Sequence, residues 1–456
     1  MVSVYSIFKE PMKNRFPLFW ILFLFFHLST FAQISQQSRD SIAQLSAADH
    51  QLMIQKLGIA ALRPGPSGNP AAPNAANSDE SKATPYSTLP NPLIFDNGSS
   101  VKNQQDWEKR SEELKEHFAR EVYGRMPENI PGVSWEIIEE KDSLFGEVNA
   151  RFKKLIGHVD NSSYPDLEVN LELMMATPLE TNRPVPLIMQ FNWVWPVGMN
   201  RPKPEGLSWQ EQMLKEGWGF AMLIPTSFQA DNGAGLRAGI IGLVNKGEPR
   251  KLGDWGTLRA WGWGASRALD YLETDPLVDA KKVGIEGLSR YGKAALVAMV
   301  DEPRFAIGFF ASSGAGGTKI FRRVYGEQVE NLASSGEYHW FTPNFIKYAG
   351  PLTPMDLPVD AHEMLALCAP RPVFISSGDP EVEGHWIDAV GMFKTTVAAS
   401  PVYEFLGKKG LETDKYPRTN FGLLNGDLVF RQHDGGHTEG PNWTYFIDFA
   451  KPYFNK

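Results

Sequence analysis

Apolar runs with strand character alternate with segments of helical spacing, and this alternation constrains the fold more than any other feature of the chain. Residues 257–272 and 293–300 carry apolar side chains at helical intervals. The strand-like runs are residues 185–193, 219–224, 283–287, 306–311, 372–376 and 428–430. Alternating strands and helices predict an α/β fold with a mostly parallel central sheet, covered by helices on both faces. Reactive side chains gather at the carboxyl ends of strands in such sheets, so these ends hold the candidates for chemistry.

Ser289 lies at one such end, where the run 283–287 passes into a helical segment. A serine at a strand-to-helix turn has a strained backbone and an exposed hydroxyl, and small residues are needed beside it because strand and helix approach closely. The helix behind the serine directs free backbone N–H groups toward a developing oxyanion. The usual hydrolase pattern has its second glycine two residues after the serine, whereas here Gly292 comes third. An incidental serine in a turn is the alternative, but the position between strand and helix favours a nucleophile.

His437 is the predicted general base. It follows the last strand-like run, and Gly435 and Gly436 before it suit a sharp loop that swings an imidazole over the serine. His433 is the rival candidate, but its position favours a strand-end residue with local hydrogen bonds. His362 precedes an apolar helical segment and is interpreted as structural.

The acid of the triad is expected between the serine and the histidine, directly after a strand. Three carboxylates follow the run 372–376, namely Asp379, Glu381 and Glu383. Asp379 comes first after the strand and is the preferred candidate, while Glu381 and Glu383 remain open. Each of the three would suit an acidic surface loop equally well. The acid would orient the imidazole and stabilise its charged form without taking the proton itself.

Composition excludes several other classes of protein. The chain has 45 Lys and Arg against 53 Asp and Glu, a net charge of −8, and it lacks the basic stripe that a nucleic-acid-binding surface needs. Its single cysteine, Cys368, excludes an intramolecular disulfide and a metal site built from cysteines. Catalysis by a serine, a histidine and an acid requires neither a metal nor an organic cofactor, so none is expected. Nothing in the sequence demands more than a monomer.

The beginning of the chain has the pattern of an export signal. Basic residues precede an uncharged run at 16–28, and small residues follow at Thr30 and Ala32, which predicts a signal peptide over residues 1–32 with cleavage after Ala32. The run is shorter than the ~20 residues that cross a bilayer, so we expect a secreted or periplasmic protein that is not held in the membrane.

Residues 33–102 are predicted to be a lead-in to a catalytic domain at residues 103–456. Within the lead-in, residues 63–82 are rich in Pro, Ala and Asn and lack large apolar side chains, so they form a linker or a surface strap. A docking helix is expected over residues 104–123. Its apolar stripe consists of Trp107, Leu114, Phe118 and Val122.

Three motifs together resemble the glucuronoyl esterases, carbohydrate esterase family fifteen, and the segments Tyr338-His339-Trp340-Phe341 and Asp360-Ala361-His362 resemble their bacterial branch. The three motifs are Ser289-Arg290-Tyr291-Gly292-Lys293, the segment Ser313-Gly314-Ala315-Gly316-Gly317, and the late Gly435-Gly436-His437. The resemblance runs from about Trp107 to the end of the chain. It implies an α/β-hydrolase with a three-layer sandwich. It also implies a substrate, the ester between 4-O-methyl-glucuronic acid on glucuronoxylan and alcohols of lignin.

The resemblance also implies roles for single residues. Ser289 matches the nucleophile, Arg290 the residue that serves the oxyanion, and His437 the base. Lys293 matches a lysine that binds hydroxyls of the sugar. Glu327 and Trp386 match further sugar contacts.

One position departs from the family's pattern. Many members carry the triad glutamate directly before the Ser-Gly-Ala-Gly-Gly segment, where this chain has Ser312. Either the acid has moved to the loop of Asp379, or the enzyme is weakened. Two alternatives therefore stay open: an acetyl-xylan or other carbohydrate esterase on the same fold, and a non-catalytic carbohydrate-binding relative of an esterase.

Overall fold

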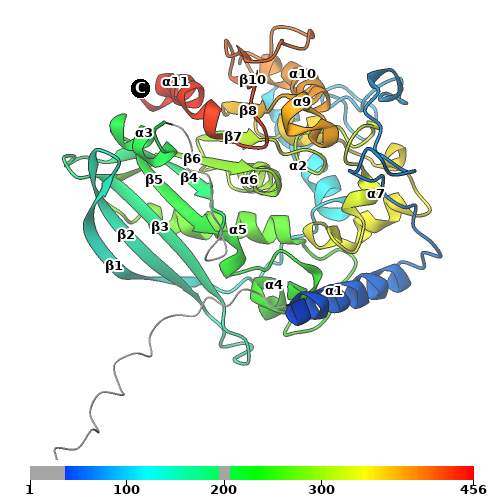
Figure 1. Ribbon diagram of the computed structural model, residues 1–456, viewed down its shortest axis with the longest axis horizontal. Coiled ribbons are helices and arrows are strands. Elements are labelled where there is room, and N and C mark those ends of the chain that lie inside the picture. Colours follow the sequence, from blue (N-terminus) through cyan, green and yellow to red (C-terminus); the bar gives the residue numbers. More distant parts are fainter. Residues whose placement is uncertain (1–35, 195–205, 456) are drawn as a thin grey trace, which may run out of the picture.

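The structure, a computed structural model, describes residues 36–194 and 206–455. The predicted signal peptide at residues 1–32 lies outside the described residues. In the described part, one ten-stranded sheet has the order β1-β2-β3-β5-β4-β6-β7-β8-β10-β9 (Figure 1). The strands are β1 (Val133–Phe145), β2 (Val148–Val159), β3 (Asn170–Pro178), β4 (Val185–Phe191), β5 (Gly219–Ile224), β6 (Val278–Leu288), β7 (Ile307–Ala311), β8 (Val373–Ser377), β9 (Phe421–Leu423) and β10 (Leu428–Gln432).

The middle of this sheet is parallel, which confirms the predicted α/β class. β5, β4, β6, β7, β8 and β10 run parallel to one another, and each overlaps one of the six apolar runs. β1, β2 and β3 extend one edge with antiparallel pairing, and β9 closes the other edge. Sequence reasoning missed β1 to β3. β1 is largely exposed and rich in charged side chains, so no apolar run marks it.

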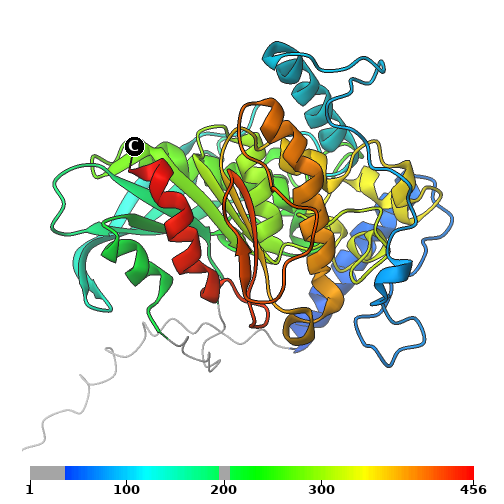
Figure 2. The same ribbon diagram turned by 90° about the horizontal axis from the view of Figure 1, so that it is seen from above.

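Helices cover both faces of the sheet (Figures 1 and 2). α3 and α11 pack on one face, and α5, α6, α8 and α10 pack on the other. β4 shows why the central strands read as continuous apolar runs: Leu187 and Met189 join the core on one side, and Ile188 joins the core on the other. The helices are α1 (Gln36–Lys56), α2 (Gln104–Glu121), α3 (Trp209–Lys215), α4 (Gly239–Val244), α5 (Thr257–Leu272), α6 (Arg290–Asp301), α7 (Val329–Leu332), α8 (Ala361–Ala366), α9 (Pro380–Glu383), α10 (Ala389–Phe405) and α11 (Trp443–Phe454).

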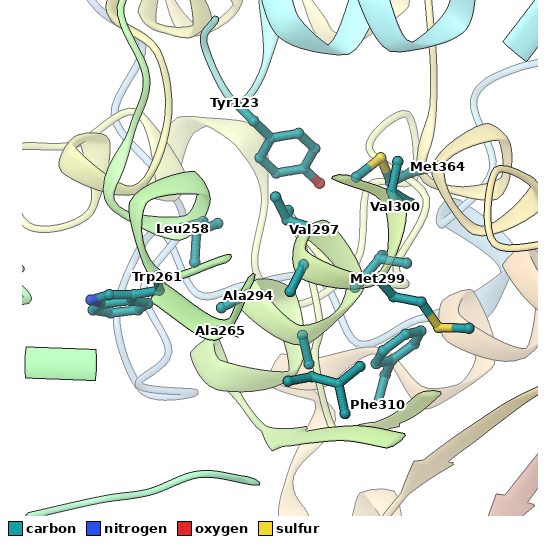
Figure 3. Close-up of a cluster of buried hydrophobic side chains, with 14 of the residues drawn as sticks. Tyr123, Leu258, Trp261, Ala265, Ala294, Val297, Met299, Val300, Phe310 and Met364 are labelled. Atoms are coloured by element: carbon teal, nitrogen blue, oxygen red, sulfur yellow. The ribbon is translucent and has the colours of Figure 1, made fainter. Parts of the chain in front are cut away.

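The larger core lies beneath the helix that follows Ser289. Figure 3 shows Trp261 and Ala265 of α5 close to Ala294 and Val297 of α6, with Phe310 of β7 beside them. These side chains are buried, so α6 is fixed against both the sheet and α5. The predicted docking helix is α2, and all four side chains of its predicted stripe are buried.

The predicted lead-in lies against the rest of the molecule. α1 buries Met53, and the segment after it is held mainly by polar contacts. Arg63 donates to Glu330 at 3.0 Å and to backbone carbonyls around Gly350, while Asn77 donates to the carbonyl of Val324 at 2.7 Å. Residues 63–82 are thus a surface strap. Across residues 36–194 and 206–455, no helix is long and apolar enough to cross a membrane.

Candidate active site

Ser289 occupies the sharp turn between β6 and α6. Its backbone has φ 62° and ψ −129°, a conformation that costs a residue other than glycine of order 1–3 kcal/mol. A Cβ atom on Gly287 would lie 2.2 Å from the carbonyl oxygen of Tyr291, so the close approach of strand and helix requires glycine there. The N–H of Ser289 donates to the carbonyl of Ala311 on β7 at 2.9 Å. The strained strand-to-helix turn that the sequence predicts is therefore present.

His437 lies in the loop after β10 and pairs with a carboxylate from the loop after β8. Its Nδ1 is 2.6 Å from Oε1 of Glu383, whose side chain is only 2 % exposed. Two features tie the loops together. The N–H of Asp379 donates to the carbonyl of Gly435 at 3.0 Å, and a Cβ on Gly378 would lie 2.5 Å from the same oxygen. A serine, a carboxylate and a histidine thus follow β6, β8 and β10 of one parallel array, in the chain order of an α/β-hydrolase triad.

Asp379, the acid preferred from the sequence, does not make this contact, whereas Glu383, which the sequence left open, does. Asp379 is the N-cap of α9: its Oδ1 accepts the N–H of Glu381 at 2.9 Å, and its Oδ2 accepts the hydroxyl of Thr419 at 2.8 Å. Glu381 is 82 % exposed and lies 3.6 Å from His385. The single turn of α9 therefore directs only Glu383 toward His437, because residue 379 is used to start the turn.

The three residues implied as sugar contacts form one chain of hydrogen bonds. Nζ of Lys293 lies 3.1 Å from Oε2 of Glu327, and Nε1 of Trp386 donates to Oε1 of Glu327 at 3.2 Å. Lys293 also donates to the carbonyl of Ala315 at 2.5 Å, within the Ser-Gly-Ala-Gly-Gly segment after β7. Lys293 and Glu327 are almost fully buried. The arrangement fixes an ammonium, a carboxylate and an indole ring near the nucleophile turn, a set that suits the hydroxyls and ring of a sugar.

Arg290 is held by a group that sequence reasoning missed. Its Nη1 donates to Oδ2 of Asp231 at 2.6 Å, and its guanidinium lies 5.2 Å from the ring centre of Trp340 and 5.5 Å from that of Trp193. Asp231 lies in the loop after β5, at the same end of the sheet as Ser289. A carboxylate shortly after a strand was the signal that could have found it.

Other residues weighed from the sequence have local partners. Nδ1 of His433 accepts the N–H of Gly435 at 3.0 Å, and His362 donates to the carbonyl of Pro90 at 2.7 Å. Burial lowers the pKa of both histidines. Burial also raises the pKa of the Cys368 thiol to about 12, so it is a protonated core residue. Among the described residues, no group of three or more His, Cys, Asp or Glu side chains is placed to hold a metal ion.

Comparison with known proteins places the chain in a family. A family model described as "Glucuronyl esterase, fungi" matches residues 250–407. A carbohydrate esterase of an unknown prokaryotic organism is 31% identical over 415 residues, which cover 83% of this chain and 92% of that protein. The chain belongs to the glucuronoyl esterases of carbohydrate esterase family 15. It is accordingly a carboxylic-ester hydrolase with the α/β-hydrolase fold.

Two further relatives differ in how similar they are to this chain. The structure of a family 15 glucuronoyl esterase from Teredinibacter turnerae is 41% identical, covers 90% of this chain and 99% of its own, and superposes with a TM-score of 0.84. A 4-O-methyl-glucuronoyl methylesterase of Wolfiporia cocos is 29% identical over 74% of this chain and 76% of its own length. The likeness to the T. turnerae esterase therefore extends over nine tenths of this chain.

Proposed function

We propose that this glucuronoyl esterase hydrolyses the ester between 4-O-methyl-glucuronic acid of glucuronoxylan and an alcohol of lignin, with Ser289, Glu383 and His437 as its triad. The observation that carries the proposal is the pairing of His437 with Glu383, in loops that follow β10 and β8 at the same edge of the sheet as the strained turn of Ser289. It supplies the acid that Ser312 cannot. The names of the relatives from T. turnerae and W. cocos support a glucuronoyl ester as substrate.

The reaction follows from the placement of these groups. Oγ of Ser289 attacks the ester carbon while the imidazole of His437 takes its proton, and the charged imidazolium is stabilised by Glu383. The oxyanion forms near the N-terminus of α6, where free N–H groups and the guanidinium of Arg290 stabilise it. The imidazolium then protonates the leaving alcohol. Water, deprotonated by the same imidazole, hydrolyses the acyl-enzyme and releases the uronic acid.

The substrate is held by a different set of residues. Lys293 and Glu327 present a charged donor and a charged acceptor to sugar hydroxyls, and Trp386 presents an aromatic face to the ring. Uronate recognition therefore rests on groups fixed by one another before substrate arrives, which reduces the entropy lost on binding.

Hydrolysis of benzyl glucuronate tests the proposal, with release of benzyl alcohol measured in the absence of added metal. The wild-type protein should cleave this ester, and Ser289→Ala should reduce kcat to background while circular dichroism and the melting temperature show an intact fold. Undiminished activity of Ser289→Ala would overturn the proposal. Faster release of acetate from acetylated xylan than of alcohol from the glucuronate ester would favour the acetyl-xylan esterase instead.

We further propose that the protein is exported as a monomer after removal of residues 1–32, and that residues 103–456 carry the catalytic machinery. The sequence pattern of the first 32 residues supports export. N-terminal sequencing of the exported protein should find Gln33 as its first residue. A mature chain that keeps residues 1–32 would contradict cleavage at that site.

A further inference from the structure

Arg290 stands next to the nucleophile in sequence, but a long, flexible side chain stabilises an oxyanion only if it is held in one orientation. Oδ2 of Asp231 lies 2.6 Å from Nη1 of Arg290, and Oδ1 of Asp231 accepts two further donors. These are Nε1 of Trp340 at 2.7 Å and Nε2 of His339 at 3.0 Å. We propose that Asp231, fixed by His339 and Trp340, is the positioning residue that orients Arg290 for oxyanion stabilisation. The inference rests on the proposed function, in which Arg290 faces the ester.

The chemistry of the group agrees with a permanent charge on Asp231. Burial alone would raise the pKa of this carboxyl, but the hydrogen bond from His339 and the charge of Arg290 outweigh it, so the pKa lies well below its usual range. Burial lowers the pKa of His339, which is therefore neutral at pH 7. A carboxylate has no proton to give, so Nε2 of His339 must carry the hydrogen. Asp231 thus receives one charged and two neutral donors and has no freedom to rotate.

The two loops that carry the group are braced from outside by α1. Oγ of Ser46 accepts the N–H of Ala234 at 3.0 Å, three residues after Asp231. The hydroxyl of Tyr338, directly before His339, donates to Oδ2 of Asp49 at 2.9 Å. One helix of the lead-in therefore contacts both the loop of Asp231 and the loop of His339. This bracing is what a positioning device needs, because a displacement of about 1 Å at a catalytic group can cost about 100-fold in rate.

The test is a double-mutant cycle with Asp231→Asn, Arg290→Ala and both together, measured on benzyl glucuronate and on p-nitrophenyl acetate. Asp231→Asn keeps the shape of the side chain and removes its charge. We expect it to lower kcat about 10- to 100-fold with a smaller change in KM. In the Arg290→Ala background, the same change should lower kcat less than twofold, because no guanidinium remains to be positioned.

Asp301→Asn is the matched control, since Asp301 forms a partly buried ion pair with Arg259 at 2.7 Å, away from the triad. It should lower the melting temperature and leave kcat unchanged. If Asp231→Asn proves unfolded, Trp340→Phe removes one donor to Asp231 and should lower kcat in the same Arg290-dependent way. Independent, multiplying effects of Asp231→Asn and Arg290→Ala would overturn the inference, as would an unchanged kcat in Asp231→Asn. Failure of the wild type to cleave benzyl glucuronate would instead sink the proposed function, and the cycle on the acetate ester would still decide the role of Asp231.

Discussion

Both carboxylate oxygens of Glu383 are committed, Oε1 to Nδ1 of His437 at 2.6 Å and Oε2 to the N–H of Gly378 at 2.5 Å. The second contact fixes the direction in which the carboxylate presents its first oxygen. Because a carboxylate can only accept, Nδ1 of His437 must carry a hydrogen, which leaves Nε2 free to take a proton. Glu383 thus sets the tautomer that a general base requires.

Changing Glu383 to Gln should lower kcat for benzyl glucuronate by about 10²- to 10⁴-fold, with a small effect on KM. The amide keeps the shape of the side chain but cannot stabilise the imidazolium, and it can donate to Nδ1 and so favour the wrong tautomer. Steady-state kinetics on the purified variant measure the effect.

Two neighbours in the same loop serve as controls for Glu383. Glu381→Gln should have wild-type kcat, because that side chain is mostly exposed and pairs with His385. Asp379→Asn should mainly reduce stability, since its oxygens cap α9 and bind Thr419. A loss of kcat in Asp379→Asn larger than that in Glu383→Gln would return the triad role to Asp379.

The sequence predicts those parts of the candidate site that have a local sequence pattern. A strained serine between an apolar strand and a helix has a spacing signature, and so does a glycine-rich loop that carries a late histidine. Glu383 could not be distinguished from Asp379 and Glu381 in this way. The three lie within five residues, and their directions depend on a single helical turn whose N-cap is one of them.

Other parts of the site and fold depend on contacts between residues far apart in the sequence, so they could not be predicted from local patterns. Asp231 meets Arg290 only because β5 and β6 end at the same edge of the sheet, and no local pattern links the two residues. The strap of residues 63–82 lacks large apolar side chains and is held by polar contacts with Glu330 and Val324. Hydrophobic periodicity therefore could not predict these contacts. β1 was missed because it is largely exposed and rich in charged side chains, so no apolar run marks it.

Replacing Trp386 with Ala should raise KM for glucuronate esters about 10- to 100-fold and change kcat less. The substitution removes an aromatic contact that contributes about 1.5–3 kcal/mol, and it also removes the donor that orients Glu327. Trp386→Phe keeps the aromatic face and should recover most of the affinity. Equal KM values for the wild type and the Ala variant would show that the sugar does not contact this ring.

The buried ion pair of Arg323 and Asp388 makes a prediction about stability. Their atoms are 2.6 Å apart and both side chains are 0% exposed. Asp388→Ala should therefore lower the free energy of unfolding by about 3–5 kcal/mol, because it leaves a buried guanidinium without its fully buried partner. Glu80 is a second partner of Arg323 but is 49% exposed, so Glu80→Ala should cost less than about 1 kcal/mol. Urea denaturation followed by tryptophan fluorescence measures both, and equal losses would contradict the argument.

Acidification should loosen α1 through His50. This side chain is buried at the contact of α1 with the catalytic domain, and its Nε2 donates to the carbonyl of Ala333 at 2.8 Å. Burial lowers the pKa of His50 below its ordinary value of 6.5, although the carbonyl of Ala333 and the charge of Asp49 oppose the shift.

The sign of the pH effect follows from proton uptake. Below pH 6.5, His50 binds a proton more readily when α1 is released than when α1 is packed, because burial lowers its pKa. The stability that His50 contributes is therefore fully present above pH 6.5. It is lost as the pH falls through the lower pKa of the packed state. Hydrogen exchange of the amides of α1 should therefore speed up between pH 7 and pH 5, after correction for intrinsic exchange rates. His50→Gln keeps a donor for Ala333 and should remove this pH dependence while Ser46 and Asp49 still hold the helix. An unchanged pH dependence in His50→Gln would assign the loosening to another group.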